Sequence, residues 1–486
     1  MEENNFIIEN GILRKYLGQE QIIKIPETVS IIGEGAFKCA YNIEKLIIPD
    51  SVKVIRKEAF KECFIYEIEM GNGVESIEES AFENIHISSD IELSNNLKYI
   101  GKNAFSLILC YDRAVGIRVP ASVIKIEKGA FSGSEFKEII LENGIKNIES
   151  NALSGTCIEN INIPGSVNDI NEILFSDCDE LKKVKLDDGI TRIKDWAFDD
   201  CELLENIEFP STLCEIGRES FRNCDNLKKV RIATDESLNI LECAFENSKI
   251  EEIEIIAKKN LYIREDSFAG IETLKYVKIF AAGYSSVTIE KDAFQECSNL
   301  ESVEIIANSE LIIGKSAFED CSSLRKLSVV SQHFPVRIAE HAFLNCTSLS
   351  DVKLSTNIYL YENAFEKCSE LEKINWIGYF NSIKFIKEVD LLHFKEEEVM
   401  DIIKNSEQVE LCNGLKAEYE KKVDVFDDDD EDEDDEYDYE PETSKNDEIL
   451  KKLEEINKSI KENNQSSNQY NNVDIDELME RLWEIL

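Results

Sequence analysis

Residues Pro210 to Ile232 read PSTLCEIGRESFRNCDNLKKVRI. In their last six residues, Leu227 to Ile232, apolar and polar side chains alternate at Val230, Arg231 and Ile232, which is typical of a β-strand with one buried face. A second apolar pair precedes Phe221, and residues 217–221 suit a short helical turn. A unit of this length cannot enclose its own apolar face, so the stretch predicts one coil of a stacked array.

The same unit recurs through most of the chain at a period of roughly 23 residues, inside the range of leucine-rich repeats. A phenylalanine marks nearly every copy, and Leu153 occupies the equivalent position in one. These marker residues are Phe37, Phe60, Phe82, Phe105, Phe131, Leu153, Phe175, Phe198, Phe221, Phe245, Phe268, Phe294, Phe318, Phe343 and Phe365. The spacing predicts about fifteen stacked coils with continuous apolar columns.

Cysteines recur three residues after the marker in many copies. They are Cys178, Cys201, Cys224, Cys297, Cys321, Cys346 and Cys368. One cysteine per repeat never gives the Cys-x-x-Cys pairs of a structural zinc site. We therefore expect a ladder of small buried side chains, with no metal and no cofactor.

The repeated pattern Ile-Pro-x-Ser/Thr-Val-x-x-Ile-Gly-x-x-Ala-Phe-x-x-Cys, visible from Ile25 to Phe37 and again around Ile48 to Val52, closely resembles the BspA-type leucine-rich repeats. The resemblance covers about three quarters of the chain. It implies a β-rich solenoid with a parallel concave sheet and short helical turns on the convex side. It also implies a role, since members of this family are surface adhesins or, where an export signal is lacking, intracellular interaction proteins. This chain departs from the adhesin pattern because it shows no export signal or wall anchor.

We assign residues 22–377 to the repeats. An Asn10-Gly11 turn between two apolar runs predicts that residues 1–21 form a hairpin that caps the first coil. The remainder, a partly disordered and partly helical tail, divides by composition. We expect a C-terminal cap at 378–426, an acidic disordered linker at 427–447, a short coiled-coil-like helix at 448–462, a polar linker at 463–472 and an amphipathic helix at 473–486.

Charge and hydropathy limit the partners and the location. The formal net charge is -45, which argues against binding to nucleic acid or to anionic membranes. The first residues lack the apolar stretch of a signal peptide, and no run of 18 apolar residues occurs. We therefore expect a cytoplasmic protein with protein partners, without membrane insertion, whose residues 448–462 offer a route to self-association.

Two regions supply candidate partner-binding residues. In the strands, the side chains that alternate with the buried column include two basic pairs, Lys183 with Lys185 and Lys229 with Arg231. These pairs either contact an acidic patch on a partner or simply keep an exposed sheet soluble. In the terminal helix, Leu478 and Leu482 share an apolar face, and Trp483 lies near the end of the chain. This helix suits a partner's groove, or else docking on the chain's own solenoid or on the preceding helix.

No motif points to an enzyme. The four histidines lack ligand spacing, and phosphate-binding loops, nucleophile elbows and His-Glu-x-x-His are absent. We expect a non-catalytic protein-interaction scaffold that acts through the solenoid, the tail or both. Two alternatives stay open: an adhesin-like protein exported without a recognisable signal, and an acidic chaperone or decoy for a basic protein, which would use the run of carboxylates from Asp427 to Glu440.

Overall fold

The computed structural model describes residues 5–111, 115–282, 284–331, 334–355, 357–361, 363–377 and 383–386. The chain divides into two compact units, Met1–Glu407 and Gln408–Leu486. All described residues belong to the first unit. The expected acidic linker, coiled-coil-like helix, polar linker and terminal helix lie outside the described residues, as does most of the expected cap.

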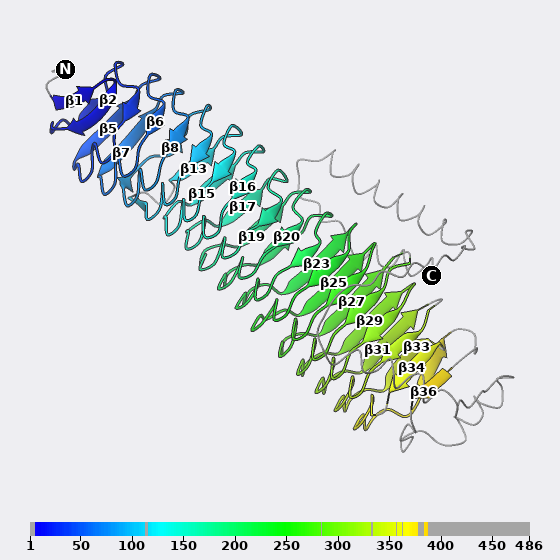
Figure 1. Ribbon diagram of the computed structural model, residues 1–486. Helices are drawn as coiled ribbons and strands as arrows, with labels where there is room; N and C mark the ends of the chain where they lie inside the picture. Colours follow the sequence, from blue (N-terminus) through cyan, green and yellow to red (C-terminus); the bar gives the residue numbers. More distant parts are fainter. Residues whose placement is uncertain are drawn as a thin grey trace, which may run out of the picture. The chain divides into compact units, whose positions relative to one another are not determined.

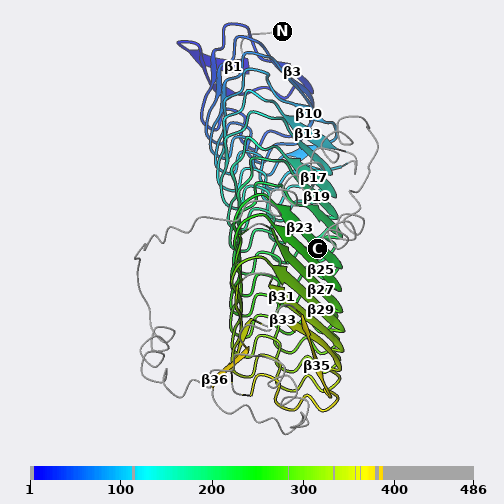
Figure 2. The ribbon, with the colours of Figure 1, turned by 90° about the vertical axis from the view of Figure 1, so that its right-hand side faces the viewer.

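The first unit is a β-solenoid of stacked coils with parallel strands (Figure 1), as the period predicts. Each coil contributes a front strand, and these pair with the equivalent strands of neighbouring coils along one side of the array (Figure 2). The front strands are β3 (Ile22–Lys24), β5 (Ile43–Ile48), β7 (Ile65–Met70), β10 (Ile91–Glu92), β13 (Gly116–Val119), β15 (Glu138–Leu141), β17 (Asn160–Ile163), β19 (Lys183–Leu186), β21 (Asn206–Glu208), β23 (Lys229–Thr234), β25 (Glu252–Ala257), β27 (Tyr276–Ala281), β29 (Ser302–Ala307), β31 (Lys326–Ser331), β33 (Asp351–Ser355) and β35 (Ile374–Ile377).

Shorter strands form a second set of parallel ladders, through the segment that precedes each marker residue. They are β4 (Ile31–Ile32), β6 (Val54–Ile55), β8 (Ser76–Ile77), β11 (Tyr99–Ile100), β14 (Lys125–Ile126), β16 (Asn147–Ile148), β18 (Asp169–Ile170), β20 (Arg192–Ile193), β22 (Glu215–Ile216), β24 (Leu238–Ile240), β26 (Leu261–Ile263), β28 (Val287–Ile289), β30 (Leu311–Ile313), β32 (Val336–Ile338), β34 (Ile358–Tyr361) and β36 (Ile383–Ile386). The pair β9 (His86–Ile87) and β12 (Leu109–Cys110) lies just before the front strands. β36 continues the short-strand ladder beyond residue 377.

An antiparallel hairpin covers the N-terminal end of the array. Strands β1 (Phe6–Glu9) and β2 (Ile12–Tyr16) pair with each other, and β2 pairs in parallel with β4. The turn between them has positive φ at Asn10 (51°) and Gly11 (75°), the conformation that a tight two-residue hairpin requires. The hairpin thus supplies backbone partners for the otherwise open edge of the first coil.

The expected short helical turns are wrong, since the described residues contain no α-helix. In each described coil the residues two before and two after the marker adopt positive φ, as Glu219 (49°) and Asn223 (57°) do around Phe221. The Phe221 N–H donates to the carbonyl of Ala244 in the next coil (2.9 Å). In an α-helix the same N–H would bond four residues back in its own coil. Bonding between coils replaces bonding within the turn.

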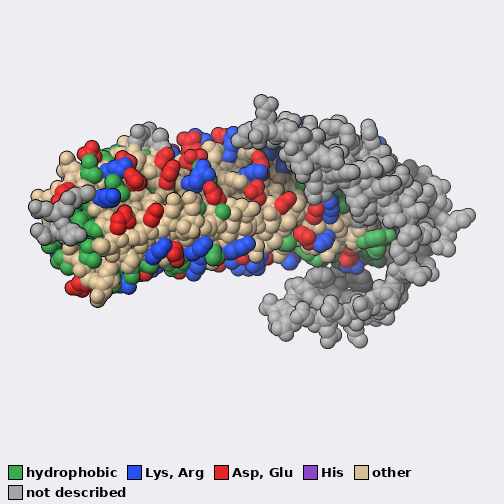
Figure 3. All heavy atoms as spheres, turned by 90° about the horizontal axis from the view of Figure 1, so that it is seen from above, with side chains coloured by type: hydrophobic (Ala, Val, Ile, Leu, Met, Phe, Trp, Pro, Cys, Tyr) green, Lys and Arg blue, Asp and Glu red, His purple; other side chains and the backbone are tan. Residues whose placement is uncertain are grey.

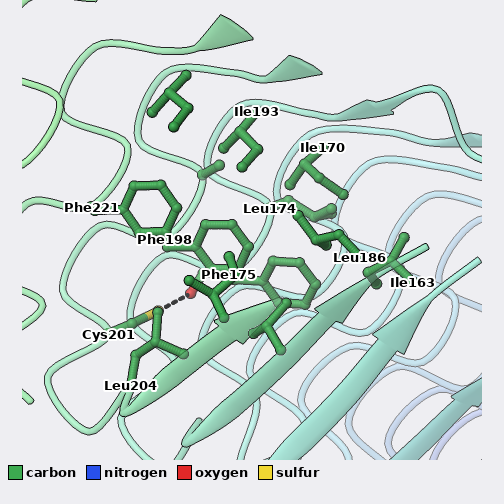
Figure 4. Packing of buried hydrophobic residues seen from close by; sticks show 14 of the residues in the cluster. Ile163, Ile170, Leu174, Phe175, Leu186, Ile193, Phe198, Cys201, Leu204 and Phe221 are labelled. Atoms are coloured by element: carbon green, nitrogen blue, oxygen red, sulfur yellow. Dashed lines mark hydrogen bonds between the residues drawn. The ribbon is translucent and has the colours of Figure 1, made fainter. Parts of the chain in front are cut away.

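The core is built from columns that run through the coils (Figure 4). The phenylalanine rings stack in near-parallel fashion, with centroids 5.1 Å apart for Phe175 and Phe198 and 5.0 Å apart for Phe221 and Phe245. Tyr16 of the hairpin stacks on Phe37 at 5.0 Å and extends the column to the N-terminal end. Leu153 is equally buried but has no ring to stack.

The cysteine ladder is present, and Cys63 adds a member that the sequence analysis did not include. Each thiol donates to the marker carbonyl of the preceding coil, as Cys201 Sγ does to Phe175 O (3.1 Å) and Cys297 Sγ to Phe268 O (3.2 Å). Burial raises the pKa of the Cys297 thiol to about 12. The Cys297 thiol is therefore a protonated structural donor, with little thiolate character.

We expect Phe221→Ala to lower the free energy of unfolding by about 3 to 5 kcal/mol, because it removes a fully buried ring from the middle of the column. Urea denaturation followed by circular dichroism measures the change. Leu203→Ala removes an exposed side chain and should change stability by less than about 0.5 kcal/mol. Equal effects of the two substitutions would contradict the stacked column.

Positive φ at Ile173 (57°) is costly because the side chain is β-branched. Replacing it with asparagine, which tolerates this conformation, should raise stability by about 1 kcal/mol. Ile124 is similarly exposed but is not among the positive-φ residues, so Ile124→Asn is the matched control and should give no gain. Thermal unfolding of the two variants tests the difference, and a gain at both positions would rule out relief of backbone strain.

Candidate protein-binding surface

The solvent side of the front strands carries rows of side chains that run along the array. Successive residues of a strand point to opposite faces, and the in-register pairing aligns equivalent positions. We define three outward rows on the front strands from β23 to β33. The first is Lys229, Glu252, Tyr276, Ser302, Lys326 and Asp351; the second is Arg231, Glu254, Lys278, Glu304, Ser328 and Lys353; the third is Ala233, Ile256, Phe280, Ile306 and Val330.

The first two rows vary in chemistry from strand to strand, whereas the two inward rows that begin at Val230 and Ile232 are aliphatic in every strand from β23 to β33. Between Lys229 and Lys326, for example, the first row changes from basic to acidic, aromatic and hydroxyl side chains. Inward residues of the same strands, such as Val230 and Ile232, are buried. Figure 3 shows acidic and basic side chains interspersed over one face of the array. The fold therefore fixes the inward residues and leaves the outward ones free to vary.

Two of the predicted basic residues belong to an ion-pair network on β23, β25 and β27. Lys229 Nζ lies 2.5 Å from a Glu252 carboxylate oxygen, and Arg231 Nε lies 3.1 Å from Glu254. Lys278 approaches Glu254 from the other side at 4.0 Å. The Glu254 side chain is 1% exposed, so loss of a flanking cation would leave a buried carboxylate under-compensated. The charges of Lys229 and Arg231 are therefore largely neutralised by Glu252 and Glu254 within the protein.

The other predicted pair is more accessible. Lys183 and Lys185 both lie exposed on β19, and Lys185 contacts Asp187 at 3.4 Å. The outward neighbours on β17 are Asn160 and Asn162, which carry no charge. On the other side β21 adds Asn206 and Glu208 between this pair and the residues of β23. The two basic pairs are thus separate features along the array. Their role in binding stays a prediction.

The third outward row was missed because the sequence pattern placed the end of each strand two residues too early. β23 extends to Thr234 and β25 to Ala257, so one further residue of each strand points outward. Ile256, Phe280 and Ile306 are buried yet lie outside the connected inner core. The sequence did contain a signal for this row, because an apolar residue recurs two positions after the second outward residue of each strand from β23 to β31. Because Ile256, Phe280 and Ile306 are buried, the first two rows carry most of the accessible chemistry.

Shielding also affects Glu304 in the second row. Burial raises the pKa of its carboxyl above the ordinary range, and Lys278 and Lys353 oppose the shift. Ionised Glu304 is therefore disfavoured in the folded protein. A carboxyl at the centre of the front face carries a desolvation cost that the surrounding cations only partly offset.

The residues predicted in the tail, Leu478, Leu482 and Trp483, lie outside the described residues. Within the described ranges, no cluster of three or more histidine, cysteine or acidic side chains could hold a metal ion. In that same part of the chain, no helix has the length and apolarity to cross a bilayer.

The sequence model of one protein family, described as "BspA type Leucine rich repeat region", matches residues 15–112, 110–228, 193–308 and 263–389. A leucine-rich repeat protein from Bacteroides ovatus is 21% identical, with 78% of this chain and 97% of that one covered and a TM-score of 0.43. A leucine rich cell surface protein from Faecalibacterium prausnitzii is 23% identical, with 68% and 92% covered and a TM-score of 0.34. No curated protein matches this chain. None of these likenesses is close enough to carry a function over.

Replacing Glu304 with glutamine should raise the free energy of unfolding at neutral pH by up to ~1 kcal/mol, because it removes the desolvated charge. The pKa of Glu304 is higher in the folded protein than in the unfolded chain, so ionisation of Glu304 lowers the stability of the wild type. This loss of stability is absent below the ordinary glutamate pKa and grows as the pH rises through the shifted value. The gain should therefore vanish near pH 4. Urea titrations of this variant and of exposed Glu208→Gln, which should show no such gain, test the sign.

Proposed function

Because this chain belongs to the BspA-type leucine-rich-repeat family, we propose that it is a non-catalytic scaffold that binds a protein through the outward rows of its front strands. The observation that carries this proposal is the contrast between the aliphatic inward rows that begin at Val230 and Ile232 and the varied first two outward rows. A surface that is exposed, extended and chemically different from coil to coil can distinguish one partner from another.

The dimensions of the front face suit a macromolecule. Seven front strands from β23 to β35 form one continuous sheet, and strands about 4.8 Å apart give it a length of roughly 30 Å. An interface of ordinary size needs about 800 Å² on each side. The sheet together with the neighbouring front strands supplies a platform of that order.

We further propose a cytoplasmic location. The thirteen cysteines Cys39, Cys63, Cys110, Cys157, Cys178, Cys201, Cys214, Cys224, Cys243, Cys297, Cys321, Cys346 and Cys368 of the described ranges are all free thiols. Many free thiols suit a reducing compartment. Recovery of the protein in washed cell-surface fractions would instead favour the adhesin-like alternative. Loss of partner binding on deletion of residues 427–440 would favour the acidic decoy.

The accessible pair on β19 offers a direct test. We expect Lys183→Glu/Lys185→Glu to weaken partner capture by the full-length chain about tenfold, because two charges on the front face are reversed without touching the core. Lys146→Glu, an exposed change beside the short strand β16, is the matched control and should leave capture unchanged. Quantitative mass spectrometry of the captured proteins measures both.

Binding that is unaffected by the β19 variant, and also by further reversals at Lys326 and Lys353, would contradict use of the front face. The Lys229 and Arg231 positions are unsuitable for this test because their substitution also disturbs the ion pairs with Glu252 and Glu254. A loss of stability there would imitate a loss of binding.

A further inference from the structure

A cluster of aromatic side chains lies on the surface of successive coils near the N-terminal end. We define the aromatic corner as Tyr41, Phe64, Tyr66, His86 and Tyr111. Centroid distances connect all five rings: 5.4 Å from Tyr41 to Phe64, 4.0 Å from Phe64 to His86, 5.4 Å from His86 to Tyr111 and 5.8 Å from Tyr111 to Tyr66. The rings sit where the chain turns into the front side, beside β7, β9 and β12.

The array itself shows that the fold does not require aromatic residues at this corner. Phe64 and Tyr66 flank the buried Ile65, which is equivalent to Leu227 and Leu324 of later coils. The flanking residues there are polar: Asn226 and Lys228, and Ser323 and Arg325. Later coils stack equally well with polar residues at the corner. The aromatic residues are therefore surplus to the needs of stacking.

The corner is accessible. Tyr41 is 65% exposed, Tyr111 57% and Tyr66 42%. A single exposed aromatic side chain carries no meaning, but a contiguous group of tyrosines is the composition that protein-binding hot spots favour. The aromatic corner has that composition and accessibility.

The charge around the aromatic corner is acidic. Lys45, the nearest lysine on β5, is held by both Glu67 (2.7 Å) and Glu69 (3.0 Å). Lys61 is held by Glu83 (3.0 Å). Nearby cations are thus already neutralised within the protein.

Carboxylates bond to residues that are close in sequence to two of the tyrosines. Glu62 accepts a hydrogen bond from the thiol of Cys39, two residues from Tyr41, and Glu135 accepts one from the backbone N–H of Cys110, next to Tyr111. Glu44 is exposed on the strand paired with β7. Open tyrosine rings near carboxylates match the guanidinium group, which stacks on rings and pairs with carboxylates.

We propose that the aromatic corner docks an arginine-containing basic segment of the protein partner. This inference rests on the proposed function and names the chemistry of the partner. Arginine suits the corner better than lysine because its planar group stacks on a ring while its N–H donors reach a neighbouring carboxylate. The partner would then lie along the array with its basic segment toward the N-terminal coils.

The test uses the full-length chain and two labelled peptides, one alternating arginine with glycine and the other lysine with glycine. Both carry the same charge, so the acidic run at 427–440 contributes a similar background to both. We expect the arginine peptide to bind about fivefold more tightly and to protect Tyr41, Tyr66 and Tyr111 from nitration by tetranitromethane, as read by mass spectrometry. Tyr276, which is 41% exposed on β27, should remain unprotected.

We expect Tyr41→Ser/Tyr111→Ser to abolish the preference for arginine, and Tyr276→Ser to leave it intact. Equal affinity for the two peptides, or binding without protection of the corner tyrosines, would overturn the inference. So would a dimer of the wild-type chain that the double variant converts to monomer in sedimentation, because the occupant would then be a second copy. A partner captured through the front face that ignores the corner variants would overturn this inference while the proposed function stands.

Discussion

The backbone hydrogen bond between neighbouring coils is the constraint on which this structure depends. At the marker position, each N–H from Phe37 to Phe343 donates to the following coil over 2.7 to 3.2 Å. The positive φ on either side of each marker keeps the turn from forming a helix, which would satisfy the same groups locally. A coil therefore cannot complete its hydrogen bonds alone. The end of the array needs a different partner, and the β1–β2 hairpin provides it for the first coil.

The same constraint separates structure from function along each strand. Inward side chains touch the equivalent residues of two neighbouring coils, so a change of size at Val230 or Phe221 is felt on both sides. Outward side chains of the first two rows contact other outward residues or solvent and take no part in the inner core. The variety in the first two rows and at the aromatic corner is consequently where specific recognition can reside, without cost to stacking.

The sequence predicted the features that repeat and missed those that depend on register. The phenylalanine period and the Leu227–Ile232 alternation were enough for parallel coils and a buried column. The helical turn at 217–221 was wrong because Glu219 and Asn223 take positive φ without a glycine to signal it. The pairing of Arg231 with Glu254 follows from strand register, which places residues of adjacent coils side by side. The aromatic corner was missed because only the residues alternating with the buried column of the front strands were read as outward, and Phe64 and Tyr66 precede those positions.

The distribution of charge differs between the N-terminal coils and the coils around β23 and β25, so the two ends of the front side are not equivalent. Around β23 and β25 cations and carboxylates are matched, and Glu254 is held between Arg231 and Lys278. Near the aromatic corner Lys45 is paired with Glu67 and Glu69, and Glu135 accepts a hydrogen bond from the backbone of Cys110, the residue before Tyr111. A uniformly charged partner would gain no electrostatic attraction from the surface around β23 and β25, where the charges are already paired. The partner that we propose, with a polar surface and one basic segment, would fit both regions in a single orientation.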